Sequence, residues 1–136
     1  MYEYKAIVTR VIDGDTIDVD IQLGFDVVLA KQRIRLLGID TPESRTRNKE
    51  EKIRGLISKN YVLDTCAVGS TIRLQSKKRG KFGRILGIIY NGDDTVSLND
   101  RMIEEGFAVP YTGGSKSELA ALHEANKQKL IQKGLL

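Results

Sequence analysis

Three short segments of the chain carry acidic and basic residues of the kinds that hydrolyse phosphate esters. They are residues 13–16 (Asp-Gly-Asp-Thr), residues 35–43 (Arg-Leu-Leu-Gly-Ile-Asp-Thr-Pro-Glu) and residues 81–84 (Lys-Phe-Gly-Arg). Carboxylates bind hard cations and orient water, and guanidinium groups neutralise the charge that develops on phosphate oxygens. Each segment alone also has a simpler interpretation, because Asp and Gly favour turns and Thr-Pro-Glu can begin a loop or a helix.

The chain has one histidine, His123, and one cysteine, Cys66. These single residues exclude an intramolecular disulfide, a cysteine zinc site and a His-rich metal cluster. We interpret His123 as a surface or core-edge residue of the last helix without a catalytic role, because no partner His, Cys or Ser pattern accompanies it. We interpret Cys66 as a small buried hydrophobe. Hydrolytic chemistry here would therefore depend on carboxylates, hydroxyl groups and a hard cation.

The composition is that of one globular domain. A length of 136 residues, with 40% apolar and 29% charged residues, is enough for one hydrophobic core. No apolar run approaches the roughly 18 residues of a membrane span, so we expect no membrane partner. The first residues have no signal-peptide pattern and predict a cytoplasmic protein, although a secreted protein whose signal had been removed would look the same.

The net charge of +4 is modest, but basic residues gather in two clusters. The clusters are Arg45, Arg47, Lys49, Lys52 and Arg54, and Lys77, Lys78, Arg79, Lys81 and Arg84. Runs of this kind are usually solvated faces, so charge alone allows nucleic-acid binding without establishing it.

The elements that must position these segments begin with strands. Residues 17–23 alternate apolar and polar side chains, as a half-buried strand does, and residues 27–37 return as its partner. Arg33 and Arg35 lie on the face opposite Ile34, so we expect both arginines to point outward from the barrel. Two further strands are predicted over 71–75 and 84–90, and Asn-Gly at 91–92 favours a tight hairpin turn after the second.

Three helices complete the predicted fold. Asn48 followed by Glu51 predicts the start of the first helix, which ends near Cys66. Its apolar stripe is predicted to contain Ile53, Leu56, Ile57 and Leu63. Residues 98–105 predict a short helix, and Ser115 with Glu118 forms a capping box for a last helix through about residue 133. This order favours an α+β fold, a five-stranded Greek-key OB-fold barrel with three flanking helices, and such barrels bind oligonucleotides.

Together, the three segments resemble the staphylococcal nuclease (thermonuclease) family in residue type, order and approximate spacing. The resemblance covers nearly the whole chain, so residues 1–136 are interpreted as a single domain of this kind. The stretch from Asp13 to Glu43 looks particularly like the short bacterial and phage members. The resemblance implies a calcium-dependent nuclease that cleaves DNA and RNA, prefers single strands or breathing duplex, and leaves 3′-phosphate and 5′-hydroxyl ends.

The resemblance also implies a metal site. Asp15 and Asp40 match the calcium-binding carboxylates of the family, and the backbone carbonyl of Thr41 matches its third protein ligand. Asp13 matches a residue that supports the metal-binding turn. Calcium takes six to eight oxygen ligands, so water and a substrate phosphate would complete such a shell.

The remaining site residues follow from the same resemblance. Arg35 and Arg84 match the two guanidinium groups that grip the scissile phosphate, and Glu43 matches the carboxylate that activates or positions the attacking water. Lys81 and Tyr111 match positions near the nucleotide, although each also has an ordinary interpretation as a surface residue.

The chain departs from the family pattern at Phe82, where tyrosine is frequent, at Gly80, where an acidic residue is frequent, and at its C-terminal end, which lacks a tryptophan. These departures put the nucleotide contacts in question. Two alternatives to an enzyme are a binding module with an OB barrel and a structural or protein-interaction domain. Carboxylates facing a phosphate would weaken binding, so Asp15, Asp40 and Glu43 favour the enzyme. We expect a monomer with no obligatory protein partner.

Overall fold

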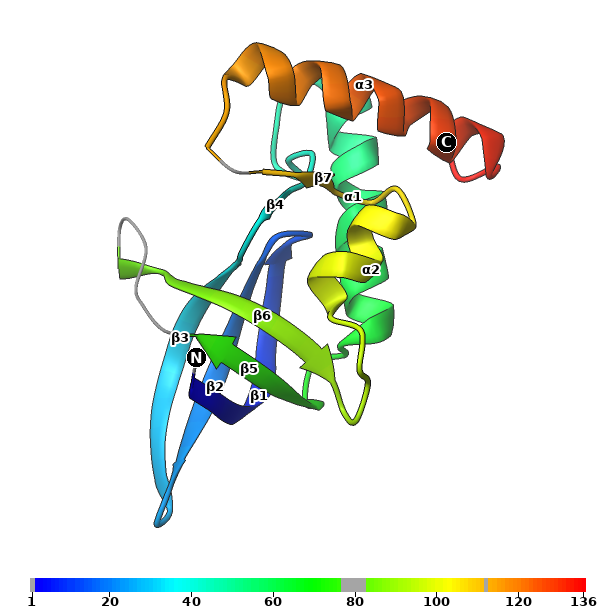
Figure 1. The fold of residues 1–136 in the computed structure, drawn as a ribbon. Coiled ribbons are helices and arrows are strands. Elements are labelled where there is room, and N and C mark those ends of the chain that lie inside the picture. The colour runs from blue at the N-terminus through cyan, green and yellow to red at the C-terminus, as the bar shows by residue number, and fades with distance from the viewer. Residues whose placement is uncertain (1, 77–82, 112) are drawn as a thin grey trace.

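The structure is a computed structural model that describes residues 2–76, 83–111 and 113–136 (Figure 1). Five strands close into a barrel in the order β1-β2-β3-β6-β5. Their bounds are Tyr2–Asp13 (β1), Thr16–Gly24 (β2), Val27–Leu36 (β3), Thr71–Ser76 (β5) and Ile85–Asn91 (β6). Neighbouring strands are antiparallel except β3 and β6, which are parallel where residues 34–36 pair with residues 85–87. The predicted five-stranded OB barrel is confirmed.

The barrel interior is filled by the apolar residues of the alternating strands. Val19 and Ile17 in β2, Ile34 in β3 and Leu74 in β5 are completely buried. Their polar neighbours in sequence lie outside, because successive side chains of a strand point to opposite faces. This alternation fixes the register of β3 and places Arg35 on the outside of the barrel, at the end where β3 leaves the sheet.

A second, two-stranded sheet was not predicted from the sequence. Strand β4 (Ile39–Asp40) pairs antiparallel with β7 (Val109–Pro110). Each of these strands has two residues, which is too short to produce an alternating pattern. The pairing ties the segment that follows β3 to the segment that follows the second helix, and it fixes the position of Asp40.

Three helices flank the barrel: α1 (Lys49–Thr65), α2 (Leu98–Glu104) and α3 (Lys116–Gln132). The predicted N-terminal caps are confirmed, because Asn48 accepts a hydrogen bond from the Glu51 N–H and Ser115 accepts one from the Glu118 N–H. None of the helices in the described ranges combines the length and the apolarity that crossing a membrane requires.

The predicted apolar stripe of α1 is half right. Ile57 and Leu63 are partly buried and pack against the core, whereas Ile53 and Leu56 are exposed. The fully buried positions of the helix are Gly55, Ser58 and Val62. Small side chains allow the helix backbone to come close to the segment that precedes it, and this close approach outweighs the burial of larger apolar side chains.

The predicted hairpin at Asn91-Gly92 is also wrong. Gly92 has the positive φ of 57° that a turn requires, but β6 is followed by α2 and not by another strand. The turn is closed by the Asp94 N–H, which donates to the carbonyl of Asn91. Asn-Gly therefore marks a turn here without marking a hairpin.

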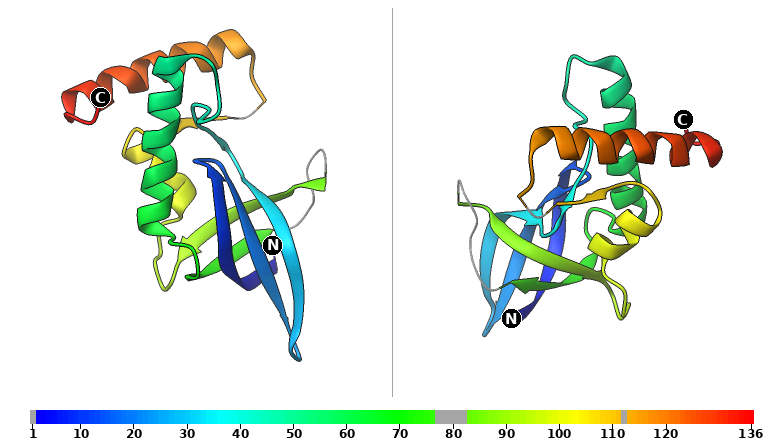
Figure 2. Two further views of the ribbon diagram at one scale, coloured as in Figure 1. Left: turned by 180° about the vertical axis from the view of Figure 1, so that it is seen from behind. Right: turned by 45° about the horizontal axis from the view of Figure 1, so that its top comes forward.

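Helix α3 crosses α1 at the end of the molecule above the barrel (Figure 2). Leu130 is the buried residue of this helix, so apolar packing contributes little to its position. Polar contacts hold it instead: Asn126 Nδ2 donates to the carbonyl of Ala108 at 2.9 Å, and Lys127 Nζ lies 2.5 Å from Glu50 Oε1 of α1.

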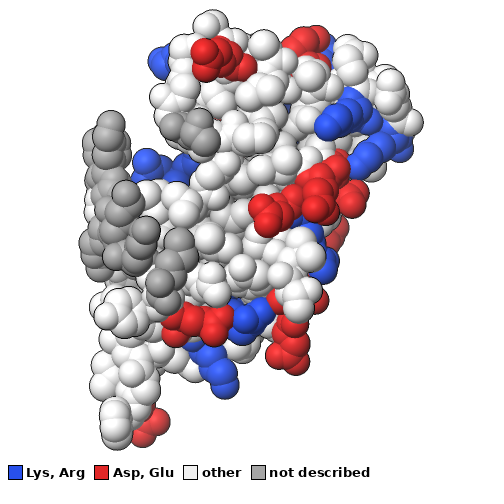
Figure 3. All heavy atoms as spheres, viewed as in Figure 1, with Lys and Arg blue, Asp and Glu red and all other residues white. Residues whose placement is uncertain are grey.

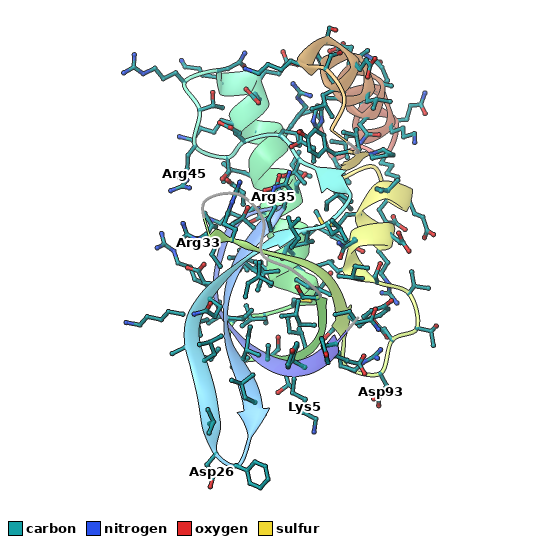
Figure 4. The ribbon with its side chains drawn as sticks, turned by 60° about the vertical axis from the view of Figure 1, so that its left-hand side comes forward. Lys5, Asp26, Arg33, Arg35, Arg45 and Asp93 are labelled. Atoms are coloured by element: carbon teal, nitrogen blue, oxygen red, sulfur yellow. The ribbon has the colours of Figure 1, made fainter. Side chains whose placement is uncertain are left out.

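The β2–β3 hairpin extends beyond the barrel, with Asp26 at the tip, at the end opposite Arg35 and α1 (Figure 4). Phe25 and Asp26 form its turn with φ values of 52° and 61°. Both values are positive, as a two-residue type I′ turn requires. The Phe25 side chain is fully exposed, and Leu23, Val27 and Val28 beside it are also exposed.

Candidate active site

A pocket of about 300 Å³ lies where the ends of β1, β2 and β3 meet α1 and α3. Seven of the nine predicted site residues line it: Asp13, Asp15, Arg35, Asp40, Thr41, Glu43 and Arg84. They come from distant parts of the chain, and barrel closure together with the β4–β7 pairing brings them together.

Arg35 is the central basic group of this pocket. Its Nη2 lies 3.3 Å from Asp40 Oδ1 and 3.5 Å from Asp15 Oδ2, and its Nη1 donates to the carbonyls of Leu36 and Ile39 at 3.1 and 2.9 Å. Its side chain is 15% exposed, compared with 47% for Arg33, which pairs with Asp18 on the outer surface. The expectation that both arginines point outward from the barrel holds, and the two differ in exposure because Arg35 lies in the pocket.

Thr41 lies directly against Asp15. Its backbone N–H donates to Asp15 Oδ2 at 3.2 Å, and Thr16 Oγ1 donates to Asp15 Oδ1 at 2.9 Å. The hydroxyl of Thr41 is buried and has no hydrogen-bond partner within the described ranges. The lone pairs of this hydroxyl oxygen are therefore available to accept a hydrogen bond or to coordinate a cation.

The donor set of the pocket fits a hard cation. Five carboxylates line the pocket against two guanidinium groups, and the Asp15 and Asp40 carboxylates flank one nitrogen of Arg35. No cluster of three or more His, Cys, Asp or Glu side chains with metal-binding geometry occurs in the part of the chain that the structure describes. Carboxylate oxygens are the ligands that hard cations take, so the chemistry of this lining is compatible with such a cation.

Asp13 supports the loop of Glu43. Asp13 Oδ1 accepts hydrogen bonds from the backbone N–H of Ser44 at 3.3 Å and from the Ser44 hydroxyl. Asp13 thereby fixes Ser44, the residue next to Glu43. The side chain of Glu43 is exposed and lines the pocket. These contacts are with the loop of Glu43, and the predicted role of Asp13 as support for the metal-binding turn remains a prediction.

The other predicted residues lie at the edge of the pocket or outside it. Arg84 lines the pocket just before β6. Tyr111 is half-exposed, donates its backbone N–H to the carbonyl of Gly38 at 2.8 Å, and is not part of the pocket lining. Lys81, together with Gly80 and Phe82, lies outside the described residues.

The pocket also contains His123, which the sequence interpretation placed at the surface or the core edge without a catalytic role. Its Nε2 lies 2.8 Å from Asp40 Oδ2, and its side chain is 15% exposed. The spacing of Leu119, His123, Asn126 and Leu130 places all four on one stripe of α3, so helical periodicity could have indicated that His123 faces inward.

Figure 3 shows one face of the molecule, on which most atoms belong to uncharged residues. Asp and Glu side chains form a band on its right-hand side, and Lys and Arg side chains form a group next to that band. Part of the second predicted basic cluster, residues 77–81, lies outside the described ranges. The charge of the pocket comes from the carboxylates and arginines named above.

Comparison with known proteins extends over most of the chain. The family of staphylococcal nuclease homologues matches residues 33–135, a range that includes Arg35, Asp40 and Glu43 and begins after Asp15. Thermonuclease of Staphylococcus intermedius is 34% identical over 104 residues, which is 75% of this chain and 56% of that protein. Micrococcal nuclease of Shigella flexneri is 27% identical over 140 residues, covering 96% of this chain and 72% of its own.

A third relative is much longer than this chain. Endonuclease YhcR of Bacillus subtilis is 29% identical over 116 residues, which is 80% of this chain and 9% of that protein. The chain thus spans about half the length of the Staphylococcus intermedius relative and less than a tenth of the Bacillus subtilis one. The family match over residues 33–135 and the closed five-stranded barrel lead to one conclusion: the chain belongs to the staphylococcal nuclease family.

Proposed function

We propose that this chain is a calcium-dependent nuclease that hydrolyses phosphodiester bonds of DNA and RNA. The observation that carries the proposal is the convergence of Asp15, Arg35, Asp40, Glu43 and Arg84 on one pocket. The names of the relatives, a thermonuclease, a micrococcal nuclease and an endonuclease, support the same reaction class.

In this proposal, the metal site is formed by the carboxylates of Asp15 and Asp40 and by the backbone carbonyl of Thr41. A calcium ion bound by these oxygens would polarise a phosphate oxygen. The remaining ligand positions are left to water and to the substrate, so calcium affinity is expected to be weak without nucleotide. Arg35 Nη2 lies close to both carboxylates and compensates part of their negative charge.

The chemical step is hydrolysis at phosphorus. A water molecule oriented by Glu43 attacks, a new P–O bond forms, and the bond from phosphorus to the 5′ oxygen breaks. The attacking water loses a proton. The 5′ oxygen gains a proton and departs as a hydroxyl group, and the phosphate remains on the 3′ oxygen. Arg84, together with an N–H of Arg35, neutralises the charge that develops on the phosphate oxygens.

The experiment is cleavage of a labelled single-stranded oligonucleotide in calcium, in magnesium and in excess chelator, with the product ends identified by mass spectrometry. We expect cleavage in calcium, little in magnesium, none in chelator, and 3′-phosphate ends. A matched G·C-rich duplex should be cut more slowly, because opening stacked pairs costs free energy. Binding without cleavage in every metal would show an OB binding module and refute the proposal.

One substitution tests the assignment of Arg84 within the same assay. Replacement Arg84→Lys keeps the charge but removes the guanidinium fork, and we expect the cleavage rate to fall on the order of a hundredfold with little change in oligonucleotide binding. The matched control is Arg101→Lys on α2, where the guanidinium pairs with Asp94 away from the pocket. Equal rates for the two variants would remove Arg84 from the proposed machinery.

A further inference from the structure

The Asp40 carboxylate is held on both of its oxygens by residues from different parts of the chain. Arg35 Nη2 lies 3.3 Å from Oδ1, and His123 Nε2 lies 2.8 Å from Oδ2. A carboxylate only accepts hydrogen bonds, so Nε2 carries the proton in this contact. A carboxyl group fixed on one oxygen alone can rotate about its terminal bond, whereas two donors in different directions prevent this rotation.

The segment of α3 around His123 is held in place by two hydrogen bonds. Arg54 of α1 donates to the His123 backbone carbonyl at 3.4 Å, and Asn126 donates to the Ala108 carbonyl at 2.9 Å. These contacts set the rotation of α3, which apolar burial at Leu130 alone does not determine. The backbone position from which the imidazole extends to Asp40 is therefore fixed.

We propose that His123 is a positioning residue for the cation site. It acts through Asp40 and orients that carboxylate toward Asp15 and the pocket, so that the two carboxylates face the same point. Removing a group that holds a metal-binding carboxylate in place commonly lowers metal affinity by about tenfold to a hundredfold. The inference rests on the proposed function, because it takes Asp40 to be a calcium ligand.

An alternative is that the contact between His123 and Asp40 only fastens α3 to the rest of the molecule. The chain offers a matched control for this alternative. Lys127 lies one turn further along the same stripe of α3 and pairs with Glu50 of α1, and it does not line the pocket. Replacement Lys127→Ala weakens the attachment of α3 and leaves the contact to Asp40 intact.

The test is calorimetric titration of the full chain with calcium alone, together with thermal unfolding and the cleavage assay. For His123→Ala we expect calcium affinity to fall about tenfold or more. For His123→Gln, whose amide nitrogen can donate from about the place of Nε2, we expect most of the affinity to return. For Lys127→Ala we expect the affinity of the parent, with a change in Tm similar to that of His123→Ala.

The outcomes separate the inference from the proposed function. Parent-like calcium affinity in His123→Ala, or an equal loss in Lys127→Ala, overturns the positioning role and leaves the nuclease proposal standing. A parent chain that binds no calcium at millimolar concentration and cleaves equally in chelator overturns both. The inference is supported if calcium affinity falls in His123→Ala, returns in His123→Gln and stays at the parent value in Lys127→Ala.

Discussion

At the scale of single residues, the environment of Cys66 links the stability of the protein to alkaline pH. Burial and, to a smaller extent, the negative charge of Asp94 raise the pKa of its thiol to about 11, and the positive charge of Arg101 opposes them. The thiol is completely buried at the end of α1. Its interpretation as a small buried hydrophobe is confirmed, and the folded protein keeps it protonated where an unfolded chain would ionise it.

We expect the free energy of unfolding to fall as the pH rises from about 9 to about 11. The folded pKa is the higher one, so the unfolded chain releases a proton in this range and the stabilisation, which is complete below pH 9, is lost. The loss attributed to Cys66 is on the order of 2–3 kcal/mol. Urea unfolding at pH 8 and pH 10.5 measures it, and Cys66→Ala, which cannot ionise, provides the reference for lysine and tyrosine titration. Equal pH slopes in the two proteins would contradict the expectation.

At the scale of elements, the contact between α1 and the loop of Glu43 depends on a glycine. A Cβ atom at Gly55 would lie 2.3 Å from the Glu43 carbonyl oxygen and 2.6 Å from the Ser44 nitrogen. Both atoms belong to the backbone, which cannot move aside as a flexible side chain does. Asp13 holds Ser44 from the other side, so the loop lies between α1 and the end of β1.

We therefore expect Gly55→Ala to displace the loop and to lower the cleavage rate strongly. The higher helix propensity of alanine favours the variant by up to about 1 kcal/mol, but the clash with backbone costs about 1–3 kcal/mol. The control is Gly114→Ala, where the added Cβ would meet the end of the flexible Glu118 side chain. Urea unfolding and the cleavage assay test this expectation. A Gly55→Ala protein as stable and as active as the parent would contradict the expected displacement of the loop.

The elements differ in how far their sequence reveals them. The caps at Asn48 and Ser115 are local contacts, so local patterns predict them. The inward face of α1 was only partly predictable from hydrophobicity, because the close approach at Gly55 requires a residue without a side chain there. The periodicity of α3 indicates that His123 faces inward, but its contact with Asp40 depends on how α3 packs against other elements.

At the scale of the whole molecule, the barrel and the outer half of the β2–β3 hairpin differ in how far their apolar side chains are buried. Ile21 is buried near the base of the hairpin, whereas Phe25 at its tip is fully exposed. We expect Phe25→Ser to change the free energy of unfolding by less than about 0.5 kcal/mol and Ile21→Ala to lower it by about 2 kcal/mol or more. Urea unfolding compares them, and a destabilisation by Phe25→Ser as large as that by Ile21→Ala would show that the tip has a packing partner.

The whole fold was easier to predict than the arrangement around the pocket. Alternation in β2 and β3 gave the barrel, and the three chemical segments gave most of the pocket lining. The β4–β7 pair was not predicted, because two-residue strands have no period. That pair and the α3 contacts bring Asp40 to Arg35 and His123, which explains why residue identities were predicted better than their hydrogen-bond partners.

The contact between His123 and Asp40 joins positions 83 residues apart in the chain. Closing so long a loop costs entropy that only a largely folded barrel can offset. During synthesis, the strands that carry Asp15, Arg35 and Asp40 leave the ribosome well before α3 does. In the nascent chain these three residues are therefore present while Asp40 still lacks one of its two hydrogen-bond donors, and the pocket reaches its final form only after α3 has been synthesised.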